Sequence, residues 1–286
     1  MPACVCCQSS RTSRVTEVAK IPYFQCRECR LIFADPQLLE QLDRGVAPRT
    51  YDAEYWKMEL AAARERSFGA SLARMAEVFY YSRIRIERFL DVGSGPGFFL
   101  DAVATHLPSR RGIFFGVEKF PPKETERTRD PNYLIGDVAS LSGRFDAGLC
   151  MEVVEHLTPR MLSELLAGLA RISNPKAAFI VNTGLADYVL KEDMGYLDPL
   201  VRGHVMAWSI ESVRLLARDH GFSVLPIRGK SWAFVLEYQS TAGADEDIRK
   251  RVWSPVPANM ETLSDPQTGQ VLKILGMETI RAYGPI

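Results

Sequence analysis

Residues 86–100, which read IERFLDVGSGPGFFL, combine a predicted buried strand with a glycine-rich turn. The first half is apolar and largely branched or aromatic, as in a buried strand, and Asp91 lies near its carboxyl end. Gly93, Gly95 and Gly97 alternate before a second apolar run that predicts a helix. A strand that turns directly into a helix presents backbone N–H groups and the positive helix end to a ligand. Glycine suits this turn because a side chain would block the ligand's approach.

The spacing of these glycines separates two classes of cofactor. Dinucleotide-binding turns read G-x-G-x-x-G and hold a pyrophosphate, but here the third glycine of that pattern would fall on Phe98. The observed G-x-G-x-G, with an acidic residue two positions before it, resembles motif I of the class I S-adenosylmethionine (SAM) methyltransferases. In that family the turn packs against the methionine part of SAM. A glycine-rich turn without a ligand is the alternative interpretation. The resemblance implies a SAM site that includes Asp91, Gly93, Ser94, Gly95 and Gly97.

Five of the six cysteines lie in the first thirty residues. Cys4 and Cys7 form one C-x-x-C pair. Cys26 and Cys29 form another, and the eighteen residues between the pairs fit four-cysteine zinc spacing. Two such turns close a tetrahedral site, and because cysteine fills every position we expect the zinc to be structural. Cys6 is left over. Disulfides and unligated thiols are the alternatives, and the absence of a secretion signal favours zinc.

Later segments extend the expected cofactor site. Glu118 ends a predicted strand about twenty residues after the glycines, where an acidic side chain can accept both ribose hydroxyls. A surface glutamate is the alternative interpretation. The resemblance implies that Asp137 meets the adenine amino group and that the backbone of Val138 meets a ring nitrogen. It also places Met151 and Glu152 along the cofactor, beneath the transferred methyl group.

Residues 144–157, RFDAGLCMEVVEHL, resemble the fourth strand and following turn of small-molecule methyltransferases. They lack the Asn/Asp-Pro-Pro-aromatic phrase of enzymes that methylate exocyclic base nitrogens. Methyl transfer from a sulfonium mainly requires positioning of the two reactants, and a general base helps an acceptor that loses a proton. His156 is the first candidate for this base, because its free pKa is near neutrality. His204 is the second, at the end of an insertion over residues 184–205 that we expect to shape the acceptor pocket. A structural role is the alternative for each histidine.

The sequence therefore predicts an α/β chain, with a Rossmann-like, seven-stranded class I methyltransferase sheet and an N-terminal zinc ribbon. The resemblance implies that tyrosines of the helical segment over residues 37–85 reach the SAM carboxylate, and Tyr51 and Tyr55 are the candidates. That segment either caps the next domain or forms a lid over the cofactor. We expect one of three roles for residues 241–286: they pack across the sheet edge, form an oligomer contact or close the acceptor site. The expected domains are a zinc ribbon (1–36), a helical linker or lid (37–85), the methyltransferase domain (86–240) and a C-terminal extension (241–286).

Composition limits the classes of partner. The 35 basic and 35 acidic residues cancel, which gives no general drive toward nucleic acid or an anionic membrane. No run approaches the roughly 18 apolar residues of a membrane span, and the start lacks a signal-peptide pattern. We expect a cytoplasmic enzyme that methylates an oxygen, or a nitrogen, of a small molecule or glycan, with a homo-oligomer left open.

Three alternatives remain. The first is an RNA methyltransferase whose ribbon grips the nucleic acid; the neutral charge and the missing base-nitrogen motif disfavour it. The second is a non-catalytic binding protein whose ribbon docks a partner; the intact cofactor-site residues disfavour it. The third is a dehydrogenase, which Phe98 disfavours. The RNA alternative draws on basic residues in and around the ribbon, namely Arg11, Arg14, Lys20, Arg27 and Arg30.

Overall fold

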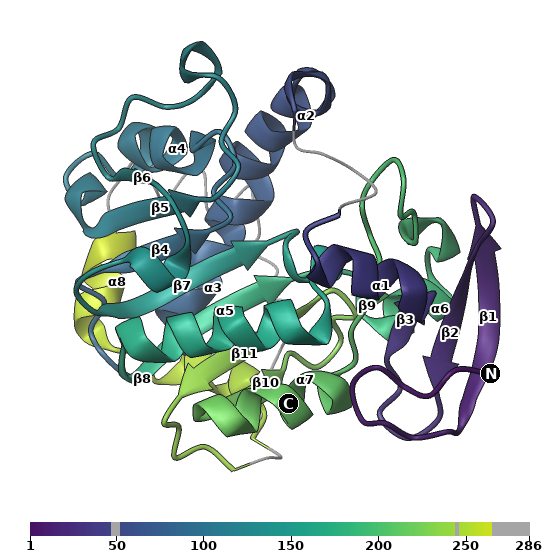
Figure 1. Cartoon of the computed structure of the whole chain (residues 1–286). Coiled ribbons are helices and arrows are strands. Elements are labelled where there is room, and N and C mark those ends of the chain that lie inside the picture. The colour runs from purple at the N-terminus through teal and green to yellow at the C-terminus, as the bar shows by residue number, and fades with distance from the viewer. Residues whose placement is uncertain (47–51, 244–245, 265–286) are drawn as a thin grey trace.

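The computed structural model describes residues 1–46, 52–243 and 246–264 (Figure 1). At its centre, seven strands lie in the order β10-β11-β8-β7-β4-β5-β6. Neighbouring strands are parallel except around β11, which is antiparallel to both β8 and β10. The fold class predicted from the sequence is thereby confirmed. The strands are β4 (Phe89–Val92), β5 (Phe114–Glu118), β6 (Tyr133–Ile135), β7 (Phe145–Met151), β8 (Ser173–Asn182), β10 (Phe222–Pro226) and β11 (Ala233–Tyr238).

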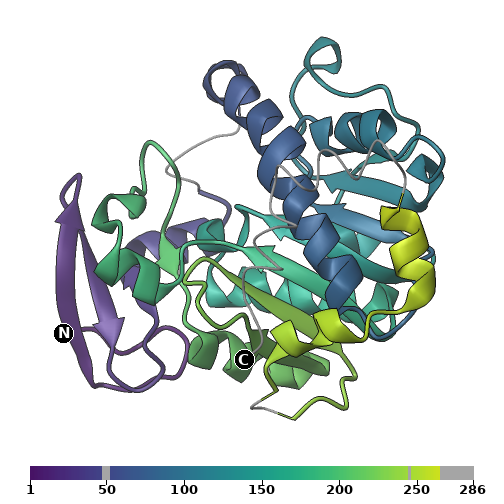
Figure 2. The same ribbon diagram turned by 180° about the vertical axis from the view of Figure 1, so that it is seen from behind.

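Helices cover both faces of this sheet. α5 (Pro159–Ile172) lies on one face and α3 (Leu72–Tyr81) on the other, as the two opposite views show (Figures 1 and 2). The central strands β7 and β8 are therefore buried along most of their length, which explains their nearly continuous apolar sequences. α4 (Phe98–His106) follows β4, and the parallel arrangement brings the carboxyl ends of β4 to β7 to one edge.

The cysteine-rich ribbon forms a second sheet, of order β1-β2-β3-β9 (Figure 1). β1 (Thr12–Val18) and β2 (Ile21–Cys26) form a hairpin, and β3 (Ile32–Ala34) pairs with β2. The fourth strand, β9 (Met206–Ala207), follows directly after the insertion over residues 184–205. The insertion also contains α6 (Ala186–Lys191). The ribbon is therefore built into the methyltransferase part of the chain by a shared sheet.

A long helical segment leads from the ribbon to β4. It contains α1 (Pro36–Asp43) and α2 (Ala53–Arg66), and one turn of π-helix, η1 (Ser67–Ser71), joins α2 directly to α3. The side chain of Asp52 caps α2 by accepting the backbone N–H groups of Glu54 and Tyr55. π-helical turns inside longer helices often occur at functional sites, and the one here lies beside the cavity described below.

The described part of the C-terminal extension packs against α3 and the approach to β4. It contains a 3₁₀ segment, η8 (Ile248–Trp253), and α8 (Pro257–Leu263), which lies beside α3 in Figure 2. Asn259 accepts the backbone N–H of Ile86 at 2.9 Å and donates to the carbonyl of Phe79. The buried Arg251 pairs with Glu237 of β11. These contacts hold the extension beside α3 on one face of the sheet, and the three roles left open by the sequence stay predictions.

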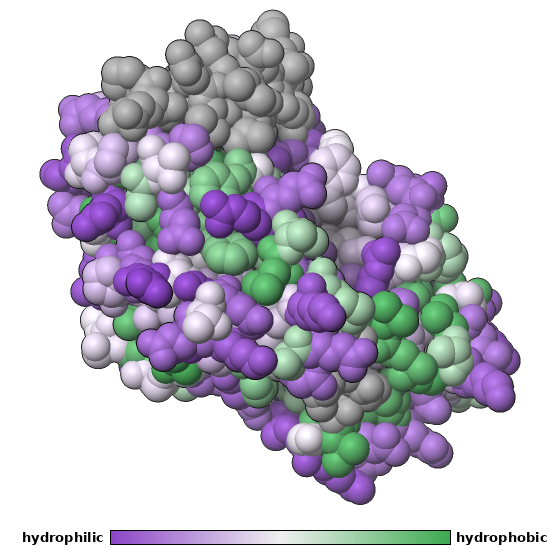
Figure 3. All heavy atoms as spheres, turned by 90° about the horizontal axis from the view of Figure 1, so that it is seen from above, coloured by the Kyte–Doolittle hydropathy of each residue, from purple (hydrophilic) through white to green (hydrophobic). Residues whose placement is uncertain are grey.

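The surface seen from above is mostly polar, with apolar side chains gathered in separate patches (Figure 3). Over the described ranges, no helix is both long enough and apolar enough to cross a membrane. α7 (Ile210–Ala217) lies between β9 and β10 in the chain and packs against α5 and β10.

Candidate functional site

A cavity of about 1080 Å³ opens at the carboxyl ends of the parallel strands. Its wall is formed by the segments that follow β4, β5, β6 and β7, together with one face of α2. β4 lies between β5 and β7, where the order of the strands reverses. In open α/β sheets this switch point is where ligands bind. The cavity therefore lies where the topology predicts a ligand site.

The glycine turn after β4 shapes the floor of this cavity. Gly93 has a left-handed φ of +70°, and a Cβ there would lie 2.5 Å from Cγ2 of Val153. A side chain is therefore excluded at this position. Gly97 has φ +75°, but its missing Cβ would meet Thr128 at 2.3 Å, on the side of the turn that packs against the protein. Gly97 is the one predicted cofactor-site residue that does not line the cavity.

Two carboxyl groups lie close together around the turn. The hydroxyl of Ser94 donates to Oδ2 of Asp91 at 2.8 Å, and the N–H of Gly95 donates to Oε2 of Glu118 at 2.8 Å. Phe120 donates its N–H to Oε1 of the same glutamate at 2.7 Å. Burial raises the pKa of Asp91 to about 7 and also raises the pKa of Glu118. Burial in this site thus opposes ionisation of both groups, and a cationic or hydroxyl-bearing ligand would favour the ionised forms.

The predicted adenine-binding residues also lie on the wall. Asp137 accepts the N–H of Ala139 at 3.0 Å and pairs with Lys119 at 2.9 Å. Burial alone would raise the pKa of Asp137, but these two partners outweigh burial and lower it. Val138, the other predicted adenine contact, follows directly and lines the same part of the cavity.

Met151 and Glu152 lie at the end of β7, also on the cavity wall. Glu152 has a left-handed φ of +54°, a conformation that a residue with a side chain rarely adopts. Its Oε1 accepts the side-chain N–H of Asn182 at 2.9 Å, and burial raises its pKa to about 8. The strained backbone holds this carboxyl group at the cavity.

The two candidate catalytic histidines lie next to each other at the cavity wall, although 48 positions separate them in the sequence. Their ring centroids are 5.0 Å apart. Nδ1 of His156 is 3.0 Å from the carbonyl oxygen of Gly203, and Nδ1 of His204 is 2.7 Å from that of Tyr196. A carbonyl oxygen only accepts, so Nδ1 of His204 carries the proton. Burial lowers the pKa of His156 and lowers that of His204 to about 3, so both rings are neutral near pH 7.

One face of α2 was not identified by the sequence analysis. Trp56, Glu59, Ala63 and Arg66 line the cavity, and their spacing of three or four residues places them on one side of the helix. The indole N–H of Trp56 is buried and has no hydrogen-bond partner among the described residues. Helical periodicity could have grouped these side chains, but only the fold shows that this face turns to the cavity. Tyr55 also lines it, whereas Tyr51 lies outside the described residues.

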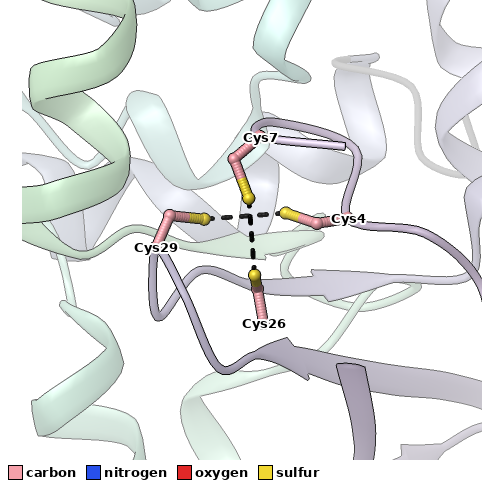
Figure 4. A group of neighbouring side chains, drawn as sticks. All are labelled: Cys4, Cys7, Cys26 and Cys29. Atoms are coloured by element: carbon pink, nitrogen blue, oxygen red, sulfur yellow. Dashed lines mark hydrogen bonds between the residues drawn. The ribbon is translucent and has the colours of Figure 1, made fainter. Parts of the chain in front are cut away.

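The four predicted zinc ligands converge on one point (Figure 4). The Sγ atoms of Cys4 and Cys29 are 3.6 Å apart, and those of Cys7 and Cys26 are 3.5 Å apart. A disulfide would require about 2.05 Å, whereas sulfurs around a tetrahedral zinc at about 2.3 Å lie roughly 3.8 Å from each other. The sulfur geometry therefore fits a metal. Cys6 is not part of the cluster, and its Sγ lies 3.7 Å from the carbonyl oxygen of Ser212.

The ribbon contacts the segment that carries His204 directly. The hydroxyl of Tyr23 donates to the backbone oxygen of His204 at 2.7 Å, and Ala34 donates its N–H to Val205 at 2.9 Å. Ser209 donates its hydroxyl to the carbonyl of Cys29. Folding of the ribbon is thereby linked to the position of one wall of the cavity.

The family of the chain follows from comparison with known proteins. The family model described as "Methyltransferase domain" matches residues 55–227, more than half of the chain, so the chain belongs to this family and is a methyltransferase with a class I fold. A search of curated protein sequences gives no match.

Several solved structures are similar to the chain at low sequence identity. A chain of the complex between the Haloferax volcanii Trm112 methyltransferase activator and a methyltransferase is 17% identical, with TM-score 0.47, and the match covers 66% of this chain and 96% of that one. The mitomycin 7-O-methyltransferase MmcR is 21% identical, with TM-score 0.45 and coverage of 69% and 66%. CalS10, an amino pentose methyltransferase from Micromonospora echinaspora, is 16% identical, with TM-score 0.42 and coverage of 62% and 94%.

Proposed function

We propose that this methyltransferase transfers the methyl group of SAM to an oxygen, or a nitrogen, of a small molecule or sugar. The observation that carries the proposal is the single cavity in which the glycine turn, Glu118 and Glu152 meet at the sheet's switch point. Ligand pockets commonly measure about 300–1,000 Å³, and this one, at about 1080 Å³, leaves room for a cofactor and an acceptor together.

The residues present fit SAM in three respects. Gly93 lines the cavity, and the close approach of Val153 excludes a side chain there, so backbone forms the part of the wall that the methionine part would pass. The carboxylate of Glu118, held by two backbone N–H groups, is available to accept the ribose hydroxyls. The unpartnered indole N–H of Trp56 supplies a donor for the carboxylate of the methionine part. SAM would supply an electrophilic methyl group on a positively charged sulfur, and the acidic wall around Asp91 favours that charge.

The acceptor would enter at the end of the cavity lined by His156 and His204. Arg202, two residues before His204, lines the cavity and suits an acceptor with polar or anionic groups. The protein's task is then to hold the acceptor oxygen in line with the methyl group and to exclude water. The sequence prediction that a histidine serves as the base remains a proposal.

We also propose that Cys4, Cys7, Cys26 and Cys29 hold a structural Zn²⁺, because the convergent sulfurs leave no position for a substrate. The RNA alternative is weakened by the surroundings of the ribbon's arginines. Arg11, Arg14 and Arg30 form ion pairs with Glu28, Glu17 and Asp187. These pairs balance the charge that would attract phosphates, so a small acceptor is the better match.

Calorimetric titration of the zinc-loaded protein tests the proposed function. We expect micromolar binding of SAM and of S-adenosylhomocysteine, and no binding of NADH. NADH binding without SAM binding would contradict the proposal and restore the dehydrogenase alternative. RNA binding that weakens steeply with salt, together with SAM binding, would favour the RNA methyltransferase.

A further inference from the structure

The search for further sites led to a second group of metal-ligand side chains, at the acceptor end of the cavity. Glu155 and His156 lie in a 3₁₀ turn, η5 (Val154–His156), and His204 ends the insertion. One ligand atom from each of the three residues lies within 4.8 Å of the other two. We propose that this group, defined here as the Glu-His-His cluster, binds a divalent metal ion that contacts the methyl acceptor.

The distances fit a shared ion. Nε2 of His204 is 3.8 Å from Oε1 of Glu155. Ligands at about 2.0–2.2 Å from one zinc ion stand roughly 3 to 4 Å apart, so this pair needs little movement to bind the same ion. The rings of His156 and His204 meet at 67° rather than stacking, which allows their edges to converge on one point.

A buried oxygen of Glu155 supplies an independent argument. Glu155 is fully buried, and its Oε2 accepts the hydroxyl of Thr183 at 3.0 Å. Its Oε1 is also buried but has no hydrogen-bond partner among the described residues. A buried carboxylate oxygen without a donor is strongly destabilising. The carboxyl group of Glu152 also lies beside Glu155. Nε2 of His204 lies 3.8 Å from Oε1, and it accepts rather than donates when Nδ1 carries the proton. Two acceptors that face each other require a cation or a proton between them.

Backbone carbonyl groups orient both histidines as in known metal sites. Nδ1–H of His204 donates to the carbonyl of Tyr196, and Nδ1 of His156 lies 3.0 Å from the carbonyl oxygen of Gly203. Histidines that ligate metals usually donate their other ring N–H to a carbonyl or carboxylate, which fixes the ring and its tautomer. A carbonyl partner for each ring is therefore consistent with ligation through Nε2.

The ligand set defines the class of ion. Two imidazoles and one carboxylate suit Zn²⁺, Fe²⁺ or a similar first-row ion, and three protein ligands leave coordination positions open. Because both histidines line the cavity, the open positions would face the acceptor. The Glu-His-His cluster thus differs from the cysteine cluster, whose four thiolates close the coordination shell.

The metal proposal rests on the proposed function, because the ion would act on the methyl acceptor of that reaction. An acceptor hydroxyl bound to the ion would lose its proton to solvent more easily, because the ion stabilises the resulting oxyanion. The oxyanion then forms the new O–C bond while the S–C bond of SAM breaks, and S-adenosylhomocysteine leaves. In this arrangement the histidines serve as ligands, an alternative to their predicted role as general bases.

Cobalt titration of untagged, full-length protein with zinc in the cysteine site tests the proposal. After mild chelation to empty weaker sites, we expect one further equivalent of Co²⁺ to bind, with visible absorption but without sulfur-to-cobalt charge transfer. Glu155→Gln and His204→Ala should each weaken Co²⁺ binding at least tenfold. His220→Ala is the matched control, because His220 bonds Ser163 and is not part of the cluster. It should bind Co²⁺ as the wild type does.

The outcomes separate this proposal from the proposed function. Wild-type protein that binds SAM but takes up no second metal equivalent would overturn the Glu-His-His site and leave the methyltransferase proposal intact. Cobalt binding unchanged in both cluster variants would also overturn it, as would the same loss in His220→Ala. Cobalt binding that depends on Glu155 and His204 in a protein that fails to bind SAM would support the metal site and contradict the proposed function. The wild-type stoichiometry decides the question even if a variant does not fold.

Discussion

The cysteine cluster and the Glu-His-His cluster each bring metal-ligand atoms within 4.8 Å of one another, but the chain builds them differently. The first consists of two C-x-x-C turns on one small ribbon, and the sequence shows it directly. The second joins a turn after β7 to the end of an insertion, and only the folded sheet brings these segments together. The comparison teaches that local spacing predicts sites within one element, whereas sites between elements depend on topology.

The two clusters are also physically connected. β3 of the ribbon pairs with β9, which begins two residues after His204, and Tyr23 bonds the backbone of that histidine. We expect the dependence to run one way, because the ribbon hairpin carries all four cysteines itself, whereas His204 lies beside strand β9, which pairs with the ribbon. The following predictions test this one-way dependence and the cavity beside it, from the largest expected effect to the smallest.

Cys26→Ser should have the largest effect, because a structural zinc in small domains contributes about 10–16 kcal/mol. We expect the variant to lose its zinc and the pairing of β3 with β9 to open more often. The backbone amide hydrogens of Met206 and Ala207 should then exchange faster with solvent. Metal analysis and hydrogen exchange measure both effects. Cys6→Ser is the control, because Cys6 is outside the cluster. Full zinc retention in Cys26→Ser would show that the ligand set is wrong.

Glu118→Gln should weaken SAM binding about ten- to a hundredfold. The reason is that hydrogen bonds to a charged acceptor contribute about 1.5–3 kcal/mol, and each 1.4 kcal/mol corresponds to about tenfold in affinity. Calorimetry gives the dissociation constant. Glu87→Gln is the matched control, because Glu87 is exposed and lies outside the cavity lining. Equal affinity in wild type and Glu118→Gln would remove the glutamate from the cofactor site.

Tyr23→Phe tests the connection between the clusters without removing a metal ligand. It deletes the hydroxyl that donates to the backbone of His204, which leaves a buried carbonyl oxygen unpaired and reduces the free energy of unfolding by about 1–3 kcal/mol. We expect zinc in the cysteine site to remain while Co²⁺ binding at the Glu-His-His cluster weakens severalfold. If Tyr23→Phe weakens metal binding equally at the cysteine cluster and at the Glu-His-His cluster, the whole ribbon has been disturbed. The one-way dependence would then be wrong.

Asp91→Asn should have an effect that depends on pH and is smallest at acid pH. Burial raises the folded-state pKa of Asp91 from 3.8 to about 7, so ionisation is disfavoured in the folded protein. The free energy of unfolding of the ligand-free wild type should therefore fall as pH rises from about 4 to 7. Asparagine removes this dependence, so the melting temperature of the variant should exceed that of wild type more at pH 8 than at pH 5. A difference that is the same at both pH values would contradict the assignment.

The elements with strong local signals were predictable from the sequence. Gly93 and Gly95 mark the turn, and the apolar residues before Asp91 mark β4, because buried parallel strands and tight turns leave characteristic residues. The α/β class and the position of the cavity follow from the order of such segments. The assignment of individual side chains to the cofactor remains a prediction.

The parts that the sequence did not predict depend on contacts between distant segments. Trp56 and Arg66 belong to a helix that was expected, but no local pattern shows which face of it meets the cavity. The pairing of β3 with Met206–Ala207 joins segments more than 170 positions apart, and two residues are too few for a strand signal. The closeness of His156 and His204 follows from the same tertiary arrangement.

A crystal structure of the full chain with S-adenosylhomocysteine would test the central claim most directly. The account predicts that the ligand occupies the cavity at the switch point, with its ribose hydroxyls on Glu118. Its adenine amino group should contact Asp137, and a ring nitrogen should contact the backbone of Val138. Its sulfur should then point toward His156 and His204, where the acceptor would bind. A ligand bound elsewhere, or in this cavity with its ribose away from Glu118, would contradict the account.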